Sequence, residues 1–172
     1  ITAALAGNAA TATKLATALI LLEPAKSVAI KSNLNNFLRQ NKQVLNEIYK
    51  IKNHYDNTIM VTATEPVYGY TADAMGLQMQ GLDFQWKIMN DTEPTPKMLA
   101  QYEQLIKQKK VKVLFYDNQV QTQVTKNILS LATQNHIPIV GISEMMPMNM
   151  QINQWLLSEI NQTEQALKIS TK

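Results

Sequence analysis

Cysteine is absent from this sequence of 172 residues, and histidine occurs only twice. Without cysteine the chain has no disulfide framework, no thiolate metal site and no cysteine nucleophile. It also lacks the Gly-x-Ser-x-Gly motif that carries the nucleophile of α/β-hydrolases. His54 and His136 both stand in expected loops, where a lone histidine is more often solvated than catalytic. These absences argue against a hydrolase.

Charge is sparse as well. Charged residues make up 17% of the chain, and the formal net charge is +3. The densest basic stretch, Lys107 to Lys112, contains no aromatic residue, and we interpret it as the end of a helix that runs into a strand. We therefore expect no nucleic-acid partner. A hydrophobic content of 45% in a chain of this length predicts one globular domain with its own core.

The longest apolar stretch covers residues 1–22 and fits neither a signal peptide nor a membrane span. It lacks the basic start and the Ala-x-Ala exit of a signal peptide. Threonine, asparagine and Lys14 interrupt it too often for a span. Its leucines recur near helical spacing, which predicts one amphipathic helix that ends at Glu23-Pro24. Because the chain begins inside a helix without an initiator methionine, we expect it to be part of a longer protein.

Beyond this helix, β-branched segments alternate with helical patterns, which predicts an α/β fold with a four-stranded parallel sheet and helices on both faces. Strands are expected at about 58–63, 82–88, 111–116 and 137–142. Helices are expected at about 24–52, 66–75, 96–109, 118–135 and 149–168. Trp86 and Trp155 fall on apolar faces of their segments, and we expect both in the core.

Three of the expected strands end in or near a carboxylate, namely Glu65, Asp117 and Glu144. Ligands of open parallel sheets bind beyond the carboxyl ends of the strands, so the three acids should lie along one edge within reach of one ligand. Carboxylates are hard oxygen donors that suit Mn²⁺, Mg²⁺ or Ca²⁺ and can also bind Zn²⁺. The alternative is that each acid caps a helix, and Asp117 fits this best because a helix is expected to begin at Asn118.

Two further patterns could indicate a different kind of site. A phosphoacceptor receiver domain also carries acids at strand ends, but it requires an adjacent acidic pair and a late lysine, and neither occurs here. Four methionines crowd the segment after Glu144, namely Met145, Met146, Met148 and Met150. Thioethers select Cu(I), although methionine-rich segments more often fill gaps in a core, and we expect packing here.

Several segments together resemble one family. The stretch VTATEPVYGYTADAMGL resembles the strand-loop-helix segment of solute-binding proteins of zinc and manganese ABC transporters, the metal-binding lipoproteins once called adhesins. Glu65 falls on the position of a metal ligand, and Tyr68-Gly69-Tyr70 on the aromatic run that follows it. EPAKSVAIKSNLNNFL, Glu93-Pro94-Thr95, VLFYDNQVQTQVTKNI and ISEMMP followed by INQWLLSEINQTEQAL resemble later segments of the same family, with Asp117 in a Phe-x-Glu-like motif and Glu144 at the closing ligand position.

The resemblance covers only the second half of the family pattern. It implies that residues 1–22 end a long inter-lobe helix and that residues 23–172 form the C-terminal α/β lobe of a two-lobed protein. It further implies Glu65 and Glu144 as direct ligands of Mn²⁺ or Zn²⁺, and Asp117 as a supporting or capping acid. The implied protein is not an enzyme. It would be an extracellular, cell-surface lipoprotein whose partners are the missing N-terminal lobe and the membrane permease of an ABC importer. The alternative is a metal-free extracellular interaction or adhesion domain with the same fold.

Overall fold

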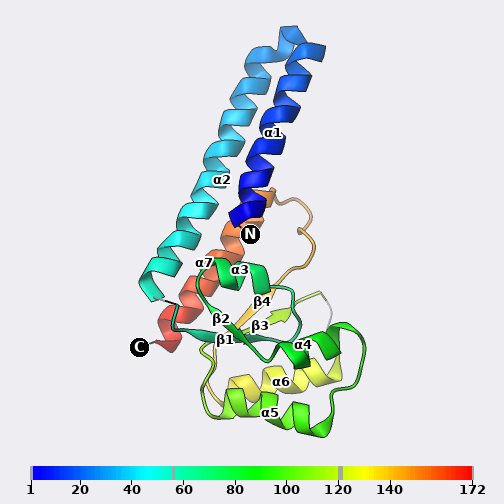
Figure 1. Cartoon of the computed structure of the whole chain (residues 1–172), viewed down its shortest axis with the longest axis vertical. Helices are drawn as coiled ribbons and strands as arrows, with labels where there is room; N and C mark the ends of the chain where they lie inside the picture. The colour runs from blue at the N-terminus through cyan, green and yellow to red at the C-terminus, as the bar shows by residue number, and fades with distance from the viewer. Residues whose placement is uncertain (1, 56, 120–121, 172) are drawn as a thin grey trace.

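A helical hairpin projects from an α/β lobe in the computed structural model, which describes residues 2–55, 57–119 and 122–171 (Figure 1). Helix α1 (Thr2–Leu22) ends at Glu23, and Pro24 begins the short 3₁₀ helix η1 (Pro24–Lys26). Proline fits the first turn of a helix but cannot continue a preceding one, so α1 ends here, as predicted. Helix α2 (Ser27–Tyr55) then returns along α1 to the lobe.

The two halves of α2 have different neighbours. Its first half lies beside α1, whereas its second half buries Val44, Ile48, Ile51 and Tyr55 in the core of the lobe. These residues recur every three or four positions and so share one helix face. Helix α1 packs against α2 and η1, and Ala16 is the one buried side chain among its residues 7–22. The leucines expected to form its apolar face are largely exposed, at 58% for Leu15 and 77% for Leu22.

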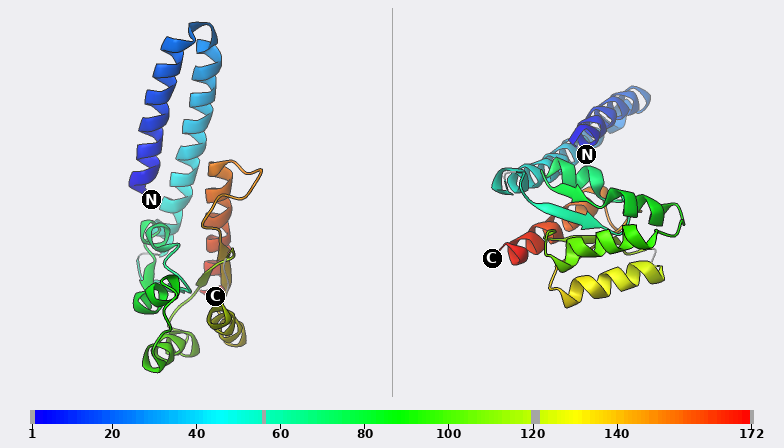
Figure 2. Two further views of the ribbon diagram at one scale, coloured as in Figure 1. Left: turned by 90° about the vertical axis from the view of Figure 1, so that its right-hand side faces the viewer. Right: turned by 60° about the horizontal axis from the view of Figure 1, so that its bottom comes forward.

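The lobe is built on a sheet of four parallel strands. They are β1 (Met60–Ala63), β2 (Gln78–Gln80), β3 (Leu114–Asp117) and β4 (Ile139–Ile142), in the order β2-β1-β3-β4. Helices α2, α3 (Gly69–Ala74) and α7 (Ile152–Ser170) supply the core on one face. Helices α4 (Leu82–Met89), α5 (Pro96–Lys107) and α6 (Gln123–Gln134) supply the core on the other (Figure 2). The predicted fold class is therefore confirmed.

One strand was predicted in the wrong place. Residues 82–88 form helix α4, and the second strand of the sheet is β2 at residues 78–80. The alternation of Leu82, Phe84, Trp86 and Ile88 suggested a strand, but the helix buries Phe84 and Ile88 and leaves Trp86 52% exposed. The expectation that Trp86 lies in the core was therefore wrong.

The reason for this error lies in β2 and in Gly81. Strand β2 reads Gln-Met-Gln, three residues at the edge of the sheet without the β-branched side chains that indicate a strand. Gly81 then adopts a φ of +75°, and a Cβ there would meet the ring of Tyr102 at 2.7 Å. Glycine alone tolerates both conditions, so the strand stops and the helix starts within one residue.

The remaining boundaries differ less from the expected ones. Helix α5 begins as predicted, with Thr95 accepting a hydrogen bond from the Met98 amide and Pro96 in the first turn. Trp155, expected in the core, is half-buried on α7. Across the part of the chain that the structure describes, no helix combines the length and the hydrophobicity needed to span a bilayer.

Candidate metal centre

The carboxyl ends of β1, β3 and β4 lie side by side at one edge of the sheet. Ala63 pairs with Phe115, so the position two residues beyond β1 is level with the end of β3. Asp117 pairs with Ile142, so the position two residues beyond β4 follows directly. Glu65, Asp117 and Glu144 therefore belong to the same edge, as the sequence predicted. We call these three residues the carboxylate edge.

Two tyrosines fix the backbone on either side of Glu65. Before it, the Tyr102 hydroxyl on α5 donates a 2.6 Å hydrogen bond to the Ala63 carbonyl oxygen and accepts one from Thr62 Oγ1 at 3.0 Å. After it, Tyr68 is buried, and its hydroxyl shares a 3.2 Å hydrogen bond with Thr163 Oγ1 on α7. Burial raises the pKa of both phenols far above the ordinary value, so both hydroxyls stay protonated. The loop that carries Glu65 is thus held against both faces of the sheet.

Glu65 itself is largely buried, and none of the ion pairs within residues 2–55, 57–119 and 122–171 involves it. The residue is 9% exposed, and none of the residues described around it donates a hydrogen bond to its carboxylate. Its pKa is raised, first by burial and then by the negative charges of Asp117, Glu144 and Asp91. A buried carboxylate that faces other acids is unfavourable in its charged form. A cation at this edge would remove that penalty.

Asp117 supports the turn that follows β3. It is 2% exposed, and its Oδ1 accepts a 2.8 Å hydrogen bond from the Gln119 amide. It does not cap α6, because α6 begins at Gln123 with Thr122 as its N-cap. The prediction of a helix from Asn118, capped by Asp117, was therefore wrong.

The helix-capping alternative fails for the other two acids as well. The N-cap of α3 is Tyr68, and that of α7 is Gln151. Glu65 and Glu144 precede these positions by three and seven residues, too far for the first turn of either helix. Glu144 is exposed in the loop after β4. The next residue, Met145, donates its amide to Gln119 Oε1 at 2.9 Å, which ties this loop to the turn after β3.

Two acids near this edge were missed by the sequence. Asp91 lies in the loop between α4 and α5, with a φ of +49°, and its charge contributes to the raised pKa of Glu65. Its position near Glu65 could not be predicted, because the sequence pattern predicts a strand where α4 lies. Glu159 lies on α7, where it is 7% exposed. The spacing of Trp155 and Glu159, four residues apart on one helix, is the one signal that could have indicated it.

Glu159 differs from Glu65 in having hydrogen-bond donors. Its Oε1 accepts from the Ser143 amide at 2.9 Å and from Trp155 Nε1 at 2.8 Å. Burial raises its pKa, and the two hydrogen bonds oppose that rise. Glu159 thereby holds Ser143, the residue next to Glu144, and positions the end of the β4 segment.

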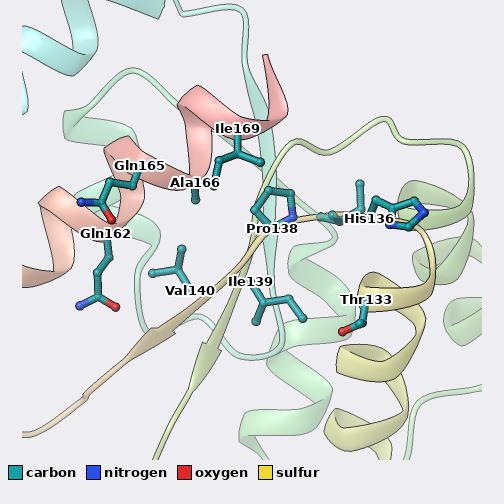
Figure 3. Close-up of a pocket in the computed structure, with 10 residues that line it drawn as sticks. Thr133, His136, Pro138, Ile139, Val140, Gln162, Gln165, Ala166 and Ile169 are labelled. Atoms are coloured by element: carbon teal, nitrogen blue, oxygen red, sulfur yellow. The ribbon is translucent and has the colours of Figure 1, made fainter. Parts of the chain in front are cut away.

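Both histidines lie away from the carboxylate edge. His136 precedes β4 with a φ of +59°, and it lines a cavity of about 560 Å³ with Pro138, Val140 and Ile169 at the amino end of the strand (Figure 3). His54 is exposed near the end of α2, before β1 begins. Within residues 2–55, 57–119 and 122–171, no three acids or histidines are arranged to hold a metal ion. The carboxylate edge thus offers hard oxygen donors but does not close a coordination sphere by itself.

Comparison with known proteins relates this chain to one family. A family model described as the periplasmic component A of the zinc-uptake complex matches residues 5–156. No curated protein matches the sequence.

Solved structures share the fold at low sequence identity. The laminin-binding protein of Streptococcus pyogenes is 18% identical with a TM-score of 0.62, over 90% of this chain and 59% of that one. A manganese-bound mutant of a periplasmic metal-binding protein from Candidatus Liberibacter asiaticus is 16% identical with a TM-score of 0.60, over 95% and 61%. The periplasmic zinc-binding protein of Treponema pallidum is 14% identical with a TM-score of 0.59, over 92% and 58%. This chain therefore spans less than two thirds of the length of each.

Proposed function

This chain belongs to the family of the periplasmic component A of zinc-uptake complexes, and from this premise we propose that it is the C-terminal lobe of a two-lobed protein that captures Mn²⁺ or Zn²⁺. The captured ion is cargo, which the protein hands to the permease of an ABC importer. In this proposal residues 1–22 end the helical connection to the other lobe, and residues 23–172 form the C-terminal lobe. The two-lobed protein works outside the cytoplasmic membrane as a cell-surface lipoprotein.

One observation carries the proposal, and it is the state of Glu65. The Glu65 residue is 9% exposed, none of the described residues donates a hydrogen bond to its carboxylate, and burial and three neighbouring acids raise its pKa, so a bound cation would stabilise its charged form. The site contains oxygen donors and no thiolate, which suits Mn²⁺ and is usable by Zn²⁺. Glu65 and Glu144 are the proposed direct ligands. Asp117 supports them, since one of its oxygens already accepts the Gln119 amide.

The donors at this edge are too few for a tight site. A hard cation takes about six oxygen or nitrogen ligands, and two carboxylates supply at most about four. The remaining ligands must come from the other lobe, across a cleft that the carboxylate edge would face. The partial coverage of the related structures, all of them longer than this chain, supports this reading.

Titration calorimetry of two proteins tests the proposal, with Mn²⁺ and Zn²⁺ as the ligands. The intact two-lobed protein is expected to bind one ion tightly, and the 172-residue chain alone is expected to bind weakly or not at all. Nanomolar affinity of the chain alone would contradict the two-lobed site. Absence of binding by both proteins would favour a metal-free interaction domain with the same fold.

A further inference from the structure

The loop between Glu144 and α7 exposes an unusual set of side chains. Residues 145–150 hold four of the nine methionines of the chain, and we call this segment the methionine loop. All four are exposed, at 70% for Met145, 46% for Met146, 90% for Met148 and 37% for Met150. Methionine is among the residues most often buried, where it fills gaps in cores. The expectation that these methionines serve for packing was therefore wrong.

The backbone of the methionine loop is held at both ends. At its start, Met145 exchanges hydrogen bonds with the side chain of Gln119, at 2.9 Å from its amide and 3.4 Å to its carbonyl oxygen. At its end, the Met150 amide donates to the Pro147 carbonyl oxygen at 3.3 Å, and Asn149 has a φ of +66°. This is a β-turn, which brings the Cα atoms of Pro147 and Met150 within about 7 Å. The thioethers thus project from an anchored, folded-back segment.

We propose that the methionine loop is a binding site for a soft monovalent cation, Cu(I), held by thioether sulfur atoms. Thioethers are soft donors that select Cu(I) over Mn²⁺ and Zn²⁺. The thioethers of residues 145–150 project into solvent, so binding needs no unfolding of the core. Met148 and Met150 stand on the turn at residues 147–150 and Met145 and Met146 directly precede it, so the loop offers more thioethers than the two or three that a low-coordinate monovalent ion needs.

This site is independent of the carboxylate edge in chemistry, although the two adjoin at Glu144. The carboxylates are hard donors for divalent ions, and the thioethers have no charge to offer them. The main rival explanation is an apolar surface that packs against another protein segment, because methionine also serves adaptable interfaces. Replacing methionine by leucine separates the two, since leucine keeps the apolar surface and removes the sulfur.

The test is a calorimetric titration of the full chain with Ag⁺, a redox-stable substitute for Cu(I), in buffer without chloride. The variant carries Met145→Leu, Met146→Leu, Met148→Leu and Met150→Leu together. A matched control carries Met60→Leu and Met89→Leu, two exposed methionines that stand alone. We expect one Ag⁺ per chain, at least tenfold weaker binding by the fourfold variant, and unchanged binding by the control. Equal affinity of the fourfold variant and the wild type would overturn the proposal.

A second measurement on the wild type needs no variant. In ¹³C spectra of labelled methionine methyl groups, Ag⁺ is expected to shift the four loop signals and to leave the buried Met75 unchanged. Uniform small shifts of all nine signals, or none, would overturn the site. Mn²⁺ binding by the intact two-lobed protein is expected to be the same with and without the four leucines. A failure of the Mn²⁺ proposal would therefore leave the Ag⁺ result interpretable, and the reverse also holds.

Discussion

The two ends of the parallel sheet differ in the titratable side chains that they carry. At the carboxyl end, Glu65, Asp117 and Glu144 gather around strand ends, and Glu65 is buried with no donor among the residues described. At the amino end, His54 and His136 are exposed, and the cavity beside Pro138 is lined mainly by apolar side chains (Figure 3). The carboxyl end therefore brings acids of like charge together around Glu65.

Position in the parallel sheet separates the carboxylates from the histidines. Histidine is the commoner zinc ligand in proteins, yet both histidines stand at the end where chains enter the sheet. The carboxylates stand where chains leave it, which is where open α/β sheets bind ligands. Within the carboxyl end, Glu159 has two hydrogen-bond donors, whereas Glu65 has none in the part of the chain that the structure describes, which separates a structural acid from a candidate ligand.

The largest expected effect sharpens the contrast between Glu159 and Glu65. Glu159→Ala leaves the Ser143 amide and Trp155 Nε1 without an acceptor, so we expect it to lower the free energy of unfolding by about 1–3 kcal/mol. Glu65→Ala removes no hydrogen bond to the residues that the structure describes and is the matched control, with little or no loss expected. Urea unfolding of both variants without metal measures this. Equal losses would mean that both acids are structural.

The second effect concerns metal affinity at the carboxyl end. Glu65→Gln keeps the shape of the side chain and removes its charge, so Mn²⁺ binding by the two-lobed protein should weaken at least about tenfold, roughly 1.4 kcal/mol. Asp117→Asn should weaken it less, because one of its oxygens already accepts the Gln119 amide. Calorimetry on both variants, with melting curves to confirm folding, decides between them. A larger loss for Asp117→Asn would mean that the wrong acid was assigned as ligand.

A third effect is a dependence of stability on pH with opposite signs at two glutamates. The pKa of Glu65 is raised above 4.5 by burial and by neighbouring acids, so its contribution to stability is present below pH 4.5 and lost as the pH rises through the folded-state pKa. Glu65→Gln should therefore raise the melting temperature of the metal-free chain at pH 7, and the gain should vanish in acid.

The control for this effect is Glu164 on α7. Hydrogen bonds from Lys168 and Lys50 lower its pKa, so its contribution is present at neutral pH and lost as the pH falls through the folded-state pKa. Glu164→Gln should lower the melting temperature at pH 7 and have no effect in strong acid. Thermal unfolding from pH 3 to 8 measures both, and effects of the same sign at pH 7 would contradict the assignment.

Most of the order of elements and the carboxylate edge could be predicted from the sequence, because both follow from local patterns. Alternating helical and β-branched segments imply a parallel sheet, and an acid after a strand needs only the strand to be located. Strand β2 could not be predicted this way. Gln78 and Gln80 are not residues with a preference for strands, and β2 pairs with β1, which is separate from it in the sequence. The role of Glu159 was likewise hidden, because its donor Ser143 comes from another element.

The roles of Asp117 and of the methionines show a second limit. The sequence indicated that Asp117 caps a helix that follows it directly. The helix instead starts at Gln123, because Thr122 and Thr125 form the capping box at its N-terminus. The methionines indicated packing. Their exposure depends on the direction in which the loop leaves the sheet, and no local sequence pattern determines that direction. In both cases a tertiary relation overturned the interpretation that the sequence favoured.

The smallest expected effect is that of the two histidines on Zn²⁺ affinity. A large effect would contradict the assignment of the metal site to the carboxyl end of the sheet. His54→Gln and His136→Asn should change the Zn²⁺ affinity of the two-lobed protein by less than about twofold, roughly 0.4 kcal/mol. Asparagine is chosen at position 136 because it tolerates the positive φ of +59° observed there. Zinc is the sharper probe, since it would use imidazole if imidazole were within reach. The same two substitutions in the Glu65→Gln background should have the same small effect as in the wild type, because residues without shared partners act additively. A tenfold loss from either histidine would place a ligand at the amino end of the sheet, and the carboxylate edge would then be a charged surface beside the true site.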